Sequence, residues 1–161
     1  MKDFTVSLKS KIGKILIKFE NKKIKKIELS SLQSFSKFEV EGKISKKFFK
    51  IIKEFENYLS GKSEDFENSK KLIDYRILSD FQKRVFEELL KVKWGTKITY
   101  SELAKRIGGE NFKRAVGRCL NKNPFPIVIP CHRVVGKNGI SGFSHGTQWK
   151  KRLLELEGIS I

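Results

Sequence analysis

The chain has 161 residues, which is enough for one mid-sized domain or two small ones. Hydrophobic residues make up 39% of the sequence, so we expect a packed core rather than disorder. No apolar stretch is long enough to span a bilayer, and the first residues lack the apolar core of a signal peptide. These features exclude a membrane partner and indicate a cytoplasmic protein.

The net charge is +17, which favours a densely negative partner, nucleic acid first. A solvated, Lys-rich surface is the alternative interpretation. Residues 76–161 hold 17 Lys and Arg against 7 Asp and Glu, whereas residues 1–75 hold 18 against 11. The positive excess therefore leans toward the second half of the chain.

The first third of the chain alternates apolar and polar residues, which is typical of strands. Strands are predicted around residues 4–8, 15–19 and 24–29, with turns at 11–14 and 20–23. Together they predict a small antiparallel meander. A helix follows, capped by Ser45 and ended by Gly61. Its apolar face is predicted to hold Phe48, Phe49, Ile52, Phe55 and Leu59. The polar segment 62–76 is interpreted as a linker.

The second half is built from helices. Asp80 is predicted to cap the first of them, and residues 94–97 to break the chain after it. The apolar side chains of this helix are Phe81, Val85, Phe86, Leu89 and Leu90.

Two short helices come next, at residues 102–107 and 112–121, joined by a Gly-Gly turn. Thr99 or Ser101 is predicted to start the first helix, and Asn111 to cap the second. A helix-turn-helix and an ordinary helical hairpin both fit this pattern.

The last third holds an apolar run at residues 127–129, predicted as a buried strand that Pro130 ends, and a final helix from residue 147 to 157. The fold class is therefore α+β. We predict an N-terminal domain, residues 1–75, with a small antiparallel sheet and a helix. A mostly helical C-terminal domain, residues 76–161, carries the helix-turn-helix and Cys131, the candidate active-site cysteine.

Cys131 and His132 form the sharpest chemical feature of the sequence. A thiol beside an imidazole can become a nucleophile, because a nearby base or positive charge raises the thiolate fraction. A buried, inert Cys beside a satisfied His is the alternative. Adjacent residues of an extended chain point to opposite sides, so contact would need a tight turn or a bridging water. Glu157 is the candidate carboxylate to orient the imidazole. A metal site would need more ligands at short spacing, because only His132 and His145 are available and Cys119 is far from Cys131 in sequence, so none is expected.

Residues 130–135 (PCHRVV) resemble the active-site signature of the O6-alkylguanine-DNA alkyltransferase family, also called methylated-DNA–protein-cysteine methyltransferases. Four further segments resemble the same family: 100–104 (YSELA), 114–117 (RAVG), 123–129 (NPFPIVI) and 153–158 (LLELEG). The similarity covers roughly residues 80–158. The first domain is compatible with the ribonuclease H-like domain that the family carries, although its sequence is uninformative.

The resemblance implies a role for each matching residue. Cys131 accepts the alkyl group irreversibly, once per molecule. His132 removes the thiol proton through a water, and Glu157 orients the imidazole. Asn123 holds the turn around the site, and Tyr100 donates toward N3 of the leaving guanine.

The same resemblance implies how the substrate is held. The Ser144 backbone N–H binds O6, and the carbonyls of Cys131 and Val134 accept from the exocyclic amine, with Phe143 lining the pocket. Arg114 enters the duplex in place of the flipped nucleotide. The DNA-binding helix is expected to contribute Arg114, Ala115, Gly117 and Arg118.

The implied substrate is double-stranded DNA carrying O6-alkylguanine, and O4-alkylthymine as well. The implied protein is a monomer without a cofactor. Phe143 and His145 depart from residues frequent in the family, which puts the shape of the alkyl pocket in question.

Three rival interpretations explain less of the sequence. A non-catalytic alkyltransferase-like protein typically carries Trp at the acceptor position, where this chain has Cys131. A plain helix-turn-helix regulator would leave residues 130–135 and Glu157 unexplained. A cysteine hydrolase would need an oxyanion motif that the sequence does not present, and it would not account for the positive charge.

Overall fold

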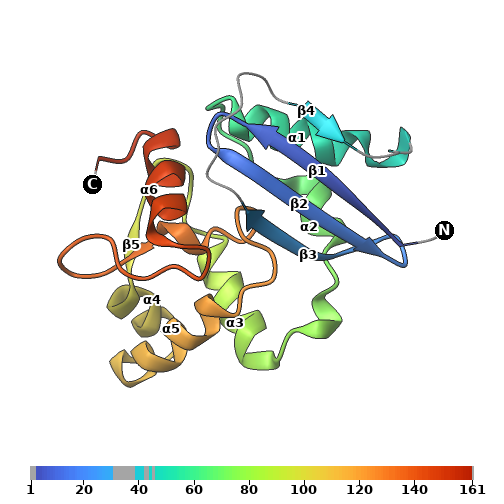
Figure 1. Ribbon diagram of the computed structural model, residues 1–161. Coiled ribbons are helices and arrows are strands. Elements are labelled where there is room, and N and C mark those ends of the chain that lie inside the picture. Colours follow the sequence, from blue (N-terminus) through green and yellow to red (C-terminus); the bar gives the residue numbers. More distant parts are fainter. Residues whose placement is uncertain (1–2, 31–38, 42–43, 45, 161) are drawn as a thin grey trace. The chain divides into compact units, whose positions relative to one another are not determined.

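The computed structural model describes residues 3–30, 39–41, 44 and 46–160 (Figure 1). The chain forms two compact units, which divide between Asp74 and Tyr75. In the described part of the chain, no helix combines the length and the apolar character needed to cross a membrane.

The first unit is built on an antiparallel sheet. Strands β1 (Phe4–Ser10), β2 (Gly13–Glu20) and β3 (Lys23–Ser30) form the meander that the alternating sequence predicted. A short strand that was not predicted, β4 (Glu39–Glu41), pairs with β1, so the strand order is β3-β2-β1-β4. Because side chains alternate across a sheet, the residues at every second position are buried on one face. They include Val6, Leu8, Ile15, Ile17 and Ile27.

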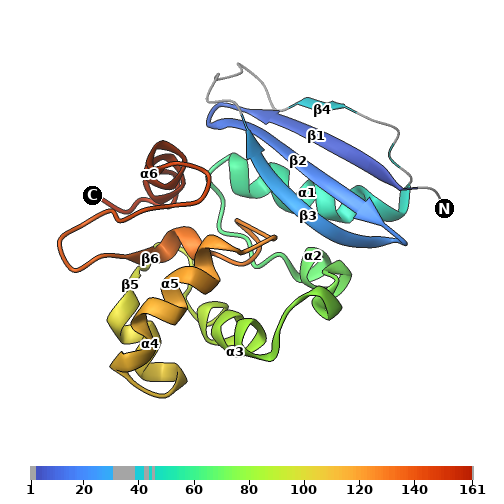
Figure 2. The ribbon, with the colours of Figure 1, turned by 60° about the horizontal axis from the view of Figure 1, so that its bottom comes forward.

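Helix α1 (Phe49–Leu59) runs along one face of this sheet (Figures 1 and 2). A 3-10 turn, η1 (Lys46–Phe48), precedes it, and the ring of Phe48 packs against Phe4 and Phe19 at centroid distances of 5.1 and 4.8 Å. The prediction that Phe49 belongs to the buried face is wrong, because this side chain is 64% exposed. The helix begins at Phe49 itself. Ile52, Phe55 and Leu59, which were predicted for the same face, are buried. The predicted cap, Ser45, lies outside the described residues.

The segment predicted as a linker, residues 62–76, is mostly folded against the first unit. It contains helix α2 (Glu67–Leu72), which the buried carboxylate of Glu54 holds at its beginning. Glu54 accepts from the Asn68 and Ser69 backbone N–H groups at 2.6 and 2.9 Å and from the Ser69 hydroxyl at 2.6 Å. The polar composition that suggested a linker therefore serves to pair a buried charge.

The second unit opens with a 3-10 turn, η2 (Tyr75–Ile77), and helix α3 (Asp80–Leu89). The cap of α3 is Ser79, not Asp80 as predicted. The Ser79 hydroxyl accepts from the backbone N–H of Gln82, and the Gln82 side chain reaches back to the Ser79 N–H. This reciprocal pair satisfies two N–H groups that an Asp80 cap would leave open.

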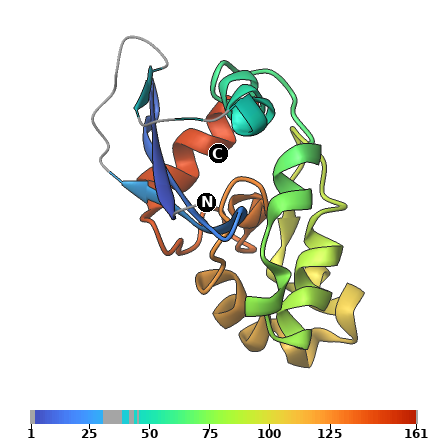
Figure 3. The same cartoon turned by 90° about the vertical axis from the view of Figure 1, so that its right-hand side faces the viewer.

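The two short helices of the second unit are α4 (Tyr100–Ile107) and α5 (Lys113–Asn121). Thr99 caps α4 in a capping box with Glu102. Of the two predicted starts, Thr99 and Ser101, the first is therefore correct. Asn111 does not cap α5, because a 3-10 turn, η3 (Glu110–Phe112), leads into that helix. Helices α3, α4 and α5 gather at one end of the unit (Figures 2 and 3).

The apolar run 127–129 is buried, but the predicted strand there is wrong. Ile127 has a φ of 75°, in the left-handed region, and the backbone N–H of Ile129 returns to the carbonyl of Phe125 at 2.9 Å. A branched side chain rarely adopts this conformation, so the tight turn stores strain of about 1–3 kcal/mol. The strands of the second unit are β5 (Ile98–Thr99) and β6 (Val134–Val135), which pair in parallel. In the chain, β5 comes directly before α4 and β6 comes after α5.

The chain then closes with helix α6 (Thr147–Leu156), within one residue of its predicted end. Its Leu154 packs with Val135 and Ile159 in a buried apolar cluster. This packing sets α6 against β6 and so brings the end of α6 to the turn that carries Cys131.

Candidate functional site

Cys131 begins a 3-10 turn, η4 (Cys131–Arg133), directly after the strained turn at Ile127. Its side chain is buried, and the Asn123 amide Nδ2 donates to its Sγ at 3.1 Å. Burial raises the pKa of Cys131 to about 11, against the opposing effects of the Asn123 amide and the Lys150 charge. The group is therefore a thiol near neutral pH, and a reaction at sulfur needs a base to remove its proton.

Asn123 connects the Cys131 thiol to the turn before it. Besides Sγ, its Nδ2 donates to the Ile129 carbonyl at 2.9 Å, and its Oδ1 accepts from the Phe125 N–H at 2.9 Å. The side chain is buried, so these contacts replace water. The sequence predicted that Asn123 holds the turn, but not that it donates to the thiol itself.

The structure brings His132 and Glu157 together. His132 Nε2 lies 2.7 Å from Glu157 Oε1, and both side chains are fully buried. Cys131 and His132 lie in one 3-10 turn. A tight turn is one of the two arrangements, beside a bridging water, that would let both residues serve one site. Burial lowers the pKa of His132 despite the neighbouring carboxylate. The imidazole is therefore neutral near pH 7, and Nδ1 is the ring nitrogen that can take a proton.

Arg133 belongs to the same buried cluster, although its place in the sequence predicts no role for it. Its Nε and Nη2 donate to the two Glu157 oxygens at 2.8 and 3.0 Å, and Nη1 donates to the Val92 carbonyl at 2.6 Å. Burial opposes ionisation of Glu157, but the hydrogen bonds and charges of His132 and Arg133 outweigh it and lower the pKa of Glu157 to about 2. A signal was available, because an Arg inside an apolar run must find a buried partner.

Gly95 provides a further contact to the carboxylate. Its backbone N–H donates to Glu157 Oε2 at 3.4 Å. Gly95 has a φ of 72°, which glycine adopts without strain. Gly95, predicted as part of a helix break, therefore also supports the buried charge of Glu157.

Tyr100 is the first residue of α4, directly after the capping Thr99. Its hydroxyl donates to the carbonyl of Gly142 at 3.5 Å, and its ring lies over Lys150 Nζ at 5.7 Å from the centroid. The α4 start is thus tied both to the loop before α6 and to α6 itself.

Four residues are predicted to bind substrate, and besides Tyr100 the other three are placed differently from one another. Val134 is buried in β6, and its carbonyl accepts from Lys150 Nζ at 2.5 Å. Phe143 and Ser144 lie in the loop before α6, where Ser144 is exposed and Phe143 packs near the His145 ring at a centroid distance of 5.5 Å. Within the described part of the chain, no hydrogen bond joins Phe143 or Ser144 to Cys131.

Helix α5 divides into a buried and a solvent-facing side. Val116, Cys119 and Leu120 face the core. The three basic side chains of the helix, Lys113, Arg114 and Arg118, are exposed. The predicted partners Ala115 and Gly117 are half-exposed beside them. Burial raises the pKa of Cys119 to about 12, which makes it a packing residue rather than a second nucleophile.

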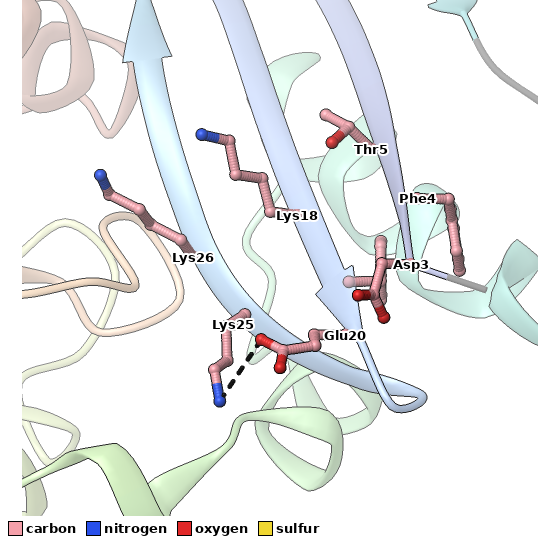
Figure 4. A pocket seen from close by; sticks show the side chains of 8 residues that line it. Asp3, Phe4, Thr5, Lys18, Glu20, Lys25 and Lys26 are labelled. Atoms are coloured by element: carbon pink, nitrogen blue, oxygen red, sulfur yellow. Dashed lines mark ion pairs between the residues drawn. The ribbon is translucent and has the colours of Figure 1, made fainter. Parts of the chain in front are cut away.

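A concave region lies on the sheet of the first unit, away from the residues described above in the sequence (Figure 4). Charged side chains surround it, among them Lys18, Lys26 and the ion pair of Lys25 with Glu20 at 3.5 Å. None of the predicted site residues lines this pocket. Among the residues that the structure describes, no group of three or more His, Cys, Asp or Glu is placed to hold a metal ion.

The sequence matches known proteins in its second half and beyond. The profile of the 6-O-methylguanine DNA methyltransferase, DNA binding domain, matches residues 80–159. A methylated-DNA–protein-cysteine methyltransferase of Metallosphaera sedula is 44% identical over 115 residues, which cover 71% of this chain and 70% of that protein. The chain belongs to the methylated-DNA–protein-cysteine methyltransferase family. The resemblance drawn from five short segments is thereby confirmed.

Solved structures extend the similarity to the whole fold. The O6-methylguanine-DNA methyltransferase of Pyrococcus kodakaraensis is 26% identical, with a TM-score of 0.73 over 98% of this chain and 99% of that one. Mycobacterium tuberculosis OGT in complex with DNA is 27% identical, with a TM-score of 0.71 over 94% and 91% of the two chains. The α+β fold predicted from the sequence is therefore that of the methyltransferase family.

Proposed function

We propose that this protein repairs alkylated DNA by moving the alkyl group from O6 of guanine to Sγ of its own Cys131. The observation that carries the proposal is the buried cluster at this thiol. Asn123 donates to Sγ, and the neighbouring His132 is neutral and bound to Glu157. The relatives named for this activity support it, as does the DNA in the complex of the Mycobacterium tuberculosis protein.

The reaction requires one base and one acid. His132 takes the Cys131 proton through a bridging water, and Glu157 and Arg133 hold the imidazole in place. Sulfur attacks the alkyl carbon, so the S–C bond forms while the C–O6 bond breaks. Tyr100 donates toward N3 as guanine leaves, and the proton lost by the thiol is balanced by the one gained by guanine. A thioether sulfur is a poor leaving group, so each molecule reacts once. O4-alkylthymine is a second substrate of the same chemistry.

DNA binding falls to helix α5. A stacked base cannot reach a buried thiol, so the nucleotide must leave the duplex at a cost of a few kcal/mol. The exposed Arg114 fills the space it leaves, and Arg118 contacts the backbone, with Ala115 and Gly117 allowing close approach. The helix enters the minor groove, whose limited sequence information suits repair of any sequence.

The remaining assignments complete the proposal. Residues 76–161 carry both DNA binding and alkyl transfer, and residues 1–75 form the ribonuclease H-like domain. The protein acts as a monomer in the cytoplasm on double-stranded DNA and uses no cofactor. Ser144 binds O6 through its backbone N–H, Phe143 lines the alkyl pocket, and the Cys131 and Val134 carbonyls accept from the guanine amine.

Incubation with a duplex that carries O6-methylguanine tests the proposal. We expect mass spectrometry to find one added methyl group on the Cys131 peptide and none on the Cys119 peptide. Cys131→Ser should abolish transfer while duplex affinity stays within about twofold, because charge supplies the affinity. Repeated turnover, or tight lesion binding without a methylated cysteine, would contradict self-alkylation.

A further inference from the structure

Lys150 occupies an unusual position for a lysine. It lies near the beginning of α6, as its fourth residue, and is fully buried. Its Nζ donates to the Val134 carbonyl at 2.5 Å and to the Ser141 carbonyl at 3.3 Å. Within the part of the chain that the structure describes, no carboxylate forms an ion pair with it. In the described residues, the hydrogen bonds of the ammonium therefore go to neutral carbonyl oxygens.

Such a charge is costly to keep in a core. Removing an ammonium from water disfavours its charged form, and burial lowers the pKa of Lys150 to about 8. An unbranched apolar side chain such as Met would fill a similar volume without that cost. Stability alone does not explain a lysine here, so its contacts must account for it.

The contacts of Lys150 converge on the acceptor site. The Val134 carbonyl is the proposed acceptor for the guanine amine, and a carbonyl has two lone pairs, so Lys150 can fix one and leave the other for substrate. The Ser141 carbonyl precedes Gly142, whose own carbonyl accepts from the Tyr100 hydroxyl at 3.5 Å. The Tyr100 ring also lies over Nζ. One ammonium thus joins β6, the loop before α6 and the start of α4.

The charge of Lys150 also acts on the thiol. Burial raises the pKa of Cys131, and the Lys150 charge opposes that rise after the Asn123 amide. The titratable side chains that face Lys150 are Cys131 and His132 from η4 and Tyr100 from α4.

We propose that Lys150 is a positioning residue of the acceptor site: its buried ammonium aims the Val134 carbonyl at the guanine amine, fixes the loop at Ser141, and supplies positive charge that favours the Cys131 thiolate. The inference about the carbonyls rests on the proposed function. The inference about the thiolate concerns Cys131 alone and does not need DNA.

The test uses the full chain with Lys150→Met, Lys150→Arg and the control Lys151→Met. Lys151 is the next residue of α6, but it is exposed and pairs with Glu155 at 3.8 Å. Two reactions are followed by mass spectrometry of the Cys131 peptide. Iodoacetamide alkylates the thiolate without using a guanine pocket. Single-turnover reaction with a duplex containing O6-methylguanine gives both the maximal rate constant and the DNA concentration at half that rate.

Lys150→Met should slow iodoacetamide alkylation of Cys131 about tenfold near pH 7, where the Lys150 ammonium is charged. The rates of the two proteins should converge as the pH rises above 8, because the lysine then loses its proton. The maximal transfer rate constant of Lys150→Met should also fall, whereas the half-saturating DNA concentration changes little. Lys150→Arg should restore much of the iodoacetamide rate because it keeps the charge. It should restore less of the transfer rate, because a planar guanidinium cannot reproduce the ammonium contacts to both carbonyls. Lys151→Met should match the wild type with iodoacetamide.

A purely structural lysine gives a different result. Lys150→Met would then lower the melting temperature, yet its folded fraction would keep the wild-type iodoacetamide rate near pH 7 and the wild-type transfer rate, which overturns the inference. If Lys150→Met does not fold, a Lys150→Arg variant with an unchanged iodoacetamide rate near pH 7 and an unchanged transfer rate supports the charge and refutes the positioning of the carbonyls. Absence of methyl transfer by the wild type would refute the proposed function, while the iodoacetamide rates near pH 7 would still decide the charge effect.

Discussion

Arg133 and Glu157 form a two-pronged ion pair, Nε to Oε2 at 2.8 Å and Nη2 to Oε1 at 3.0 Å, on the same carboxylate that binds His132. The Glu157 carboxylate therefore binds the Arg133 guanidinium and the His132 imidazole at the same time. Arg133 neutralises Glu157 permanently, so His132 does not need to carry a proton for the cluster to be stable. In the proposed mechanism, the imidazole gains a proton only when the thiol loses one.

Glu157→Gln should slow alkyl transfer by about 10²-fold or more, because the imidazolium formed during the reaction loses its carboxylate. The change also leaves Arg133 as an uncompensated buried charge, which should lower the free energy of unfolding by about 3–5 kcal/mol. Single-turnover rates and urea unfolding measure the two effects. The control is Glu155→Gln, an exposed position on the same helix. Wild-type rates for a folded Glu157→Gln protein would show that the proposed relay is wrong.

The same carboxylate predicts a loss of stability in acid. Its pKa is lowered to about 2 in the folded protein, below the usual value of about 4.3 for an unfolded chain. The stabilisation is thus fully present above about pH 4.3 and is lost as the pH falls toward 2. Urea unfolding at a series of pH values should show this loss in the wild type, and Glu157→Gln should lack that part of it. Parallel curves for the two proteins would contradict the assignment.

Asn123→Asp should separate the two tasks of this side chain. An aspartate still accepts from the Phe125 N–H, but it can no longer donate to Cys131 Sγ, and it adds negative charge beside the thiol. The pKa of Cys131 should rise, and a rise of one unit slows thiolate alkylation about tenfold. The rate of iodoacetamide alkylation of Cys131 measures this. Asn121→Asp, exposed at the end of α5, is the matched control and should leave the rate unchanged.

Local patterns predicted the elements, but not the contacts between distant segments. The period-2 alternation identified β1–β3 because one face of the sheet is buried. The cap of α3 was misplaced by one residue, although Gln82 stands three residues after Ser79 and marks the capping box. The apolar run at Ile127 suggested a strand because its residues favour strands, whereas its tertiary surroundings impose a turn. The partners of Arg133 and Lys150 are distant carbonyls and carboxylates, which no local pattern reveals.

Arg114→Ala should weaken repair of duplex DNA more than reaction with a free O6-alkylguanine base. A free base needs no extrusion, so a side chain that fills the vacated space is irrelevant to it. Single-turnover rates on both substrates give the comparison. The control is Lys122→Ala, an exposed charge at the end of α5, which should only reduce the salt dependence of binding, by about one unit of slope. Equal losses on the two substrates would mean that Arg114 supports the pocket instead.

His145 should restrict the size of the alkyl group that the site accepts. Its ring lies 5.5 Å from that of Phe143, and its Nδ1 lies 3.1 Å from the Ser144 hydroxyl, so the two rings flank the residue proposed to bind O6. Steric exclusion of a benzyl group costs about 1–3 kcal/mol, or about 10- to 200-fold in rate. The wild type should therefore react slowly with O6-benzylguanine, and His145→Gly should gain on this substrate without a matching gain on O6-methylguanine. The alternative is that the imidazole faces solvent or a DNA phosphate. The substitution would then lower DNA affinity and leave the benzyl-to-methyl rate ratio unchanged, so this ratio, measured in both proteins, decides between the two.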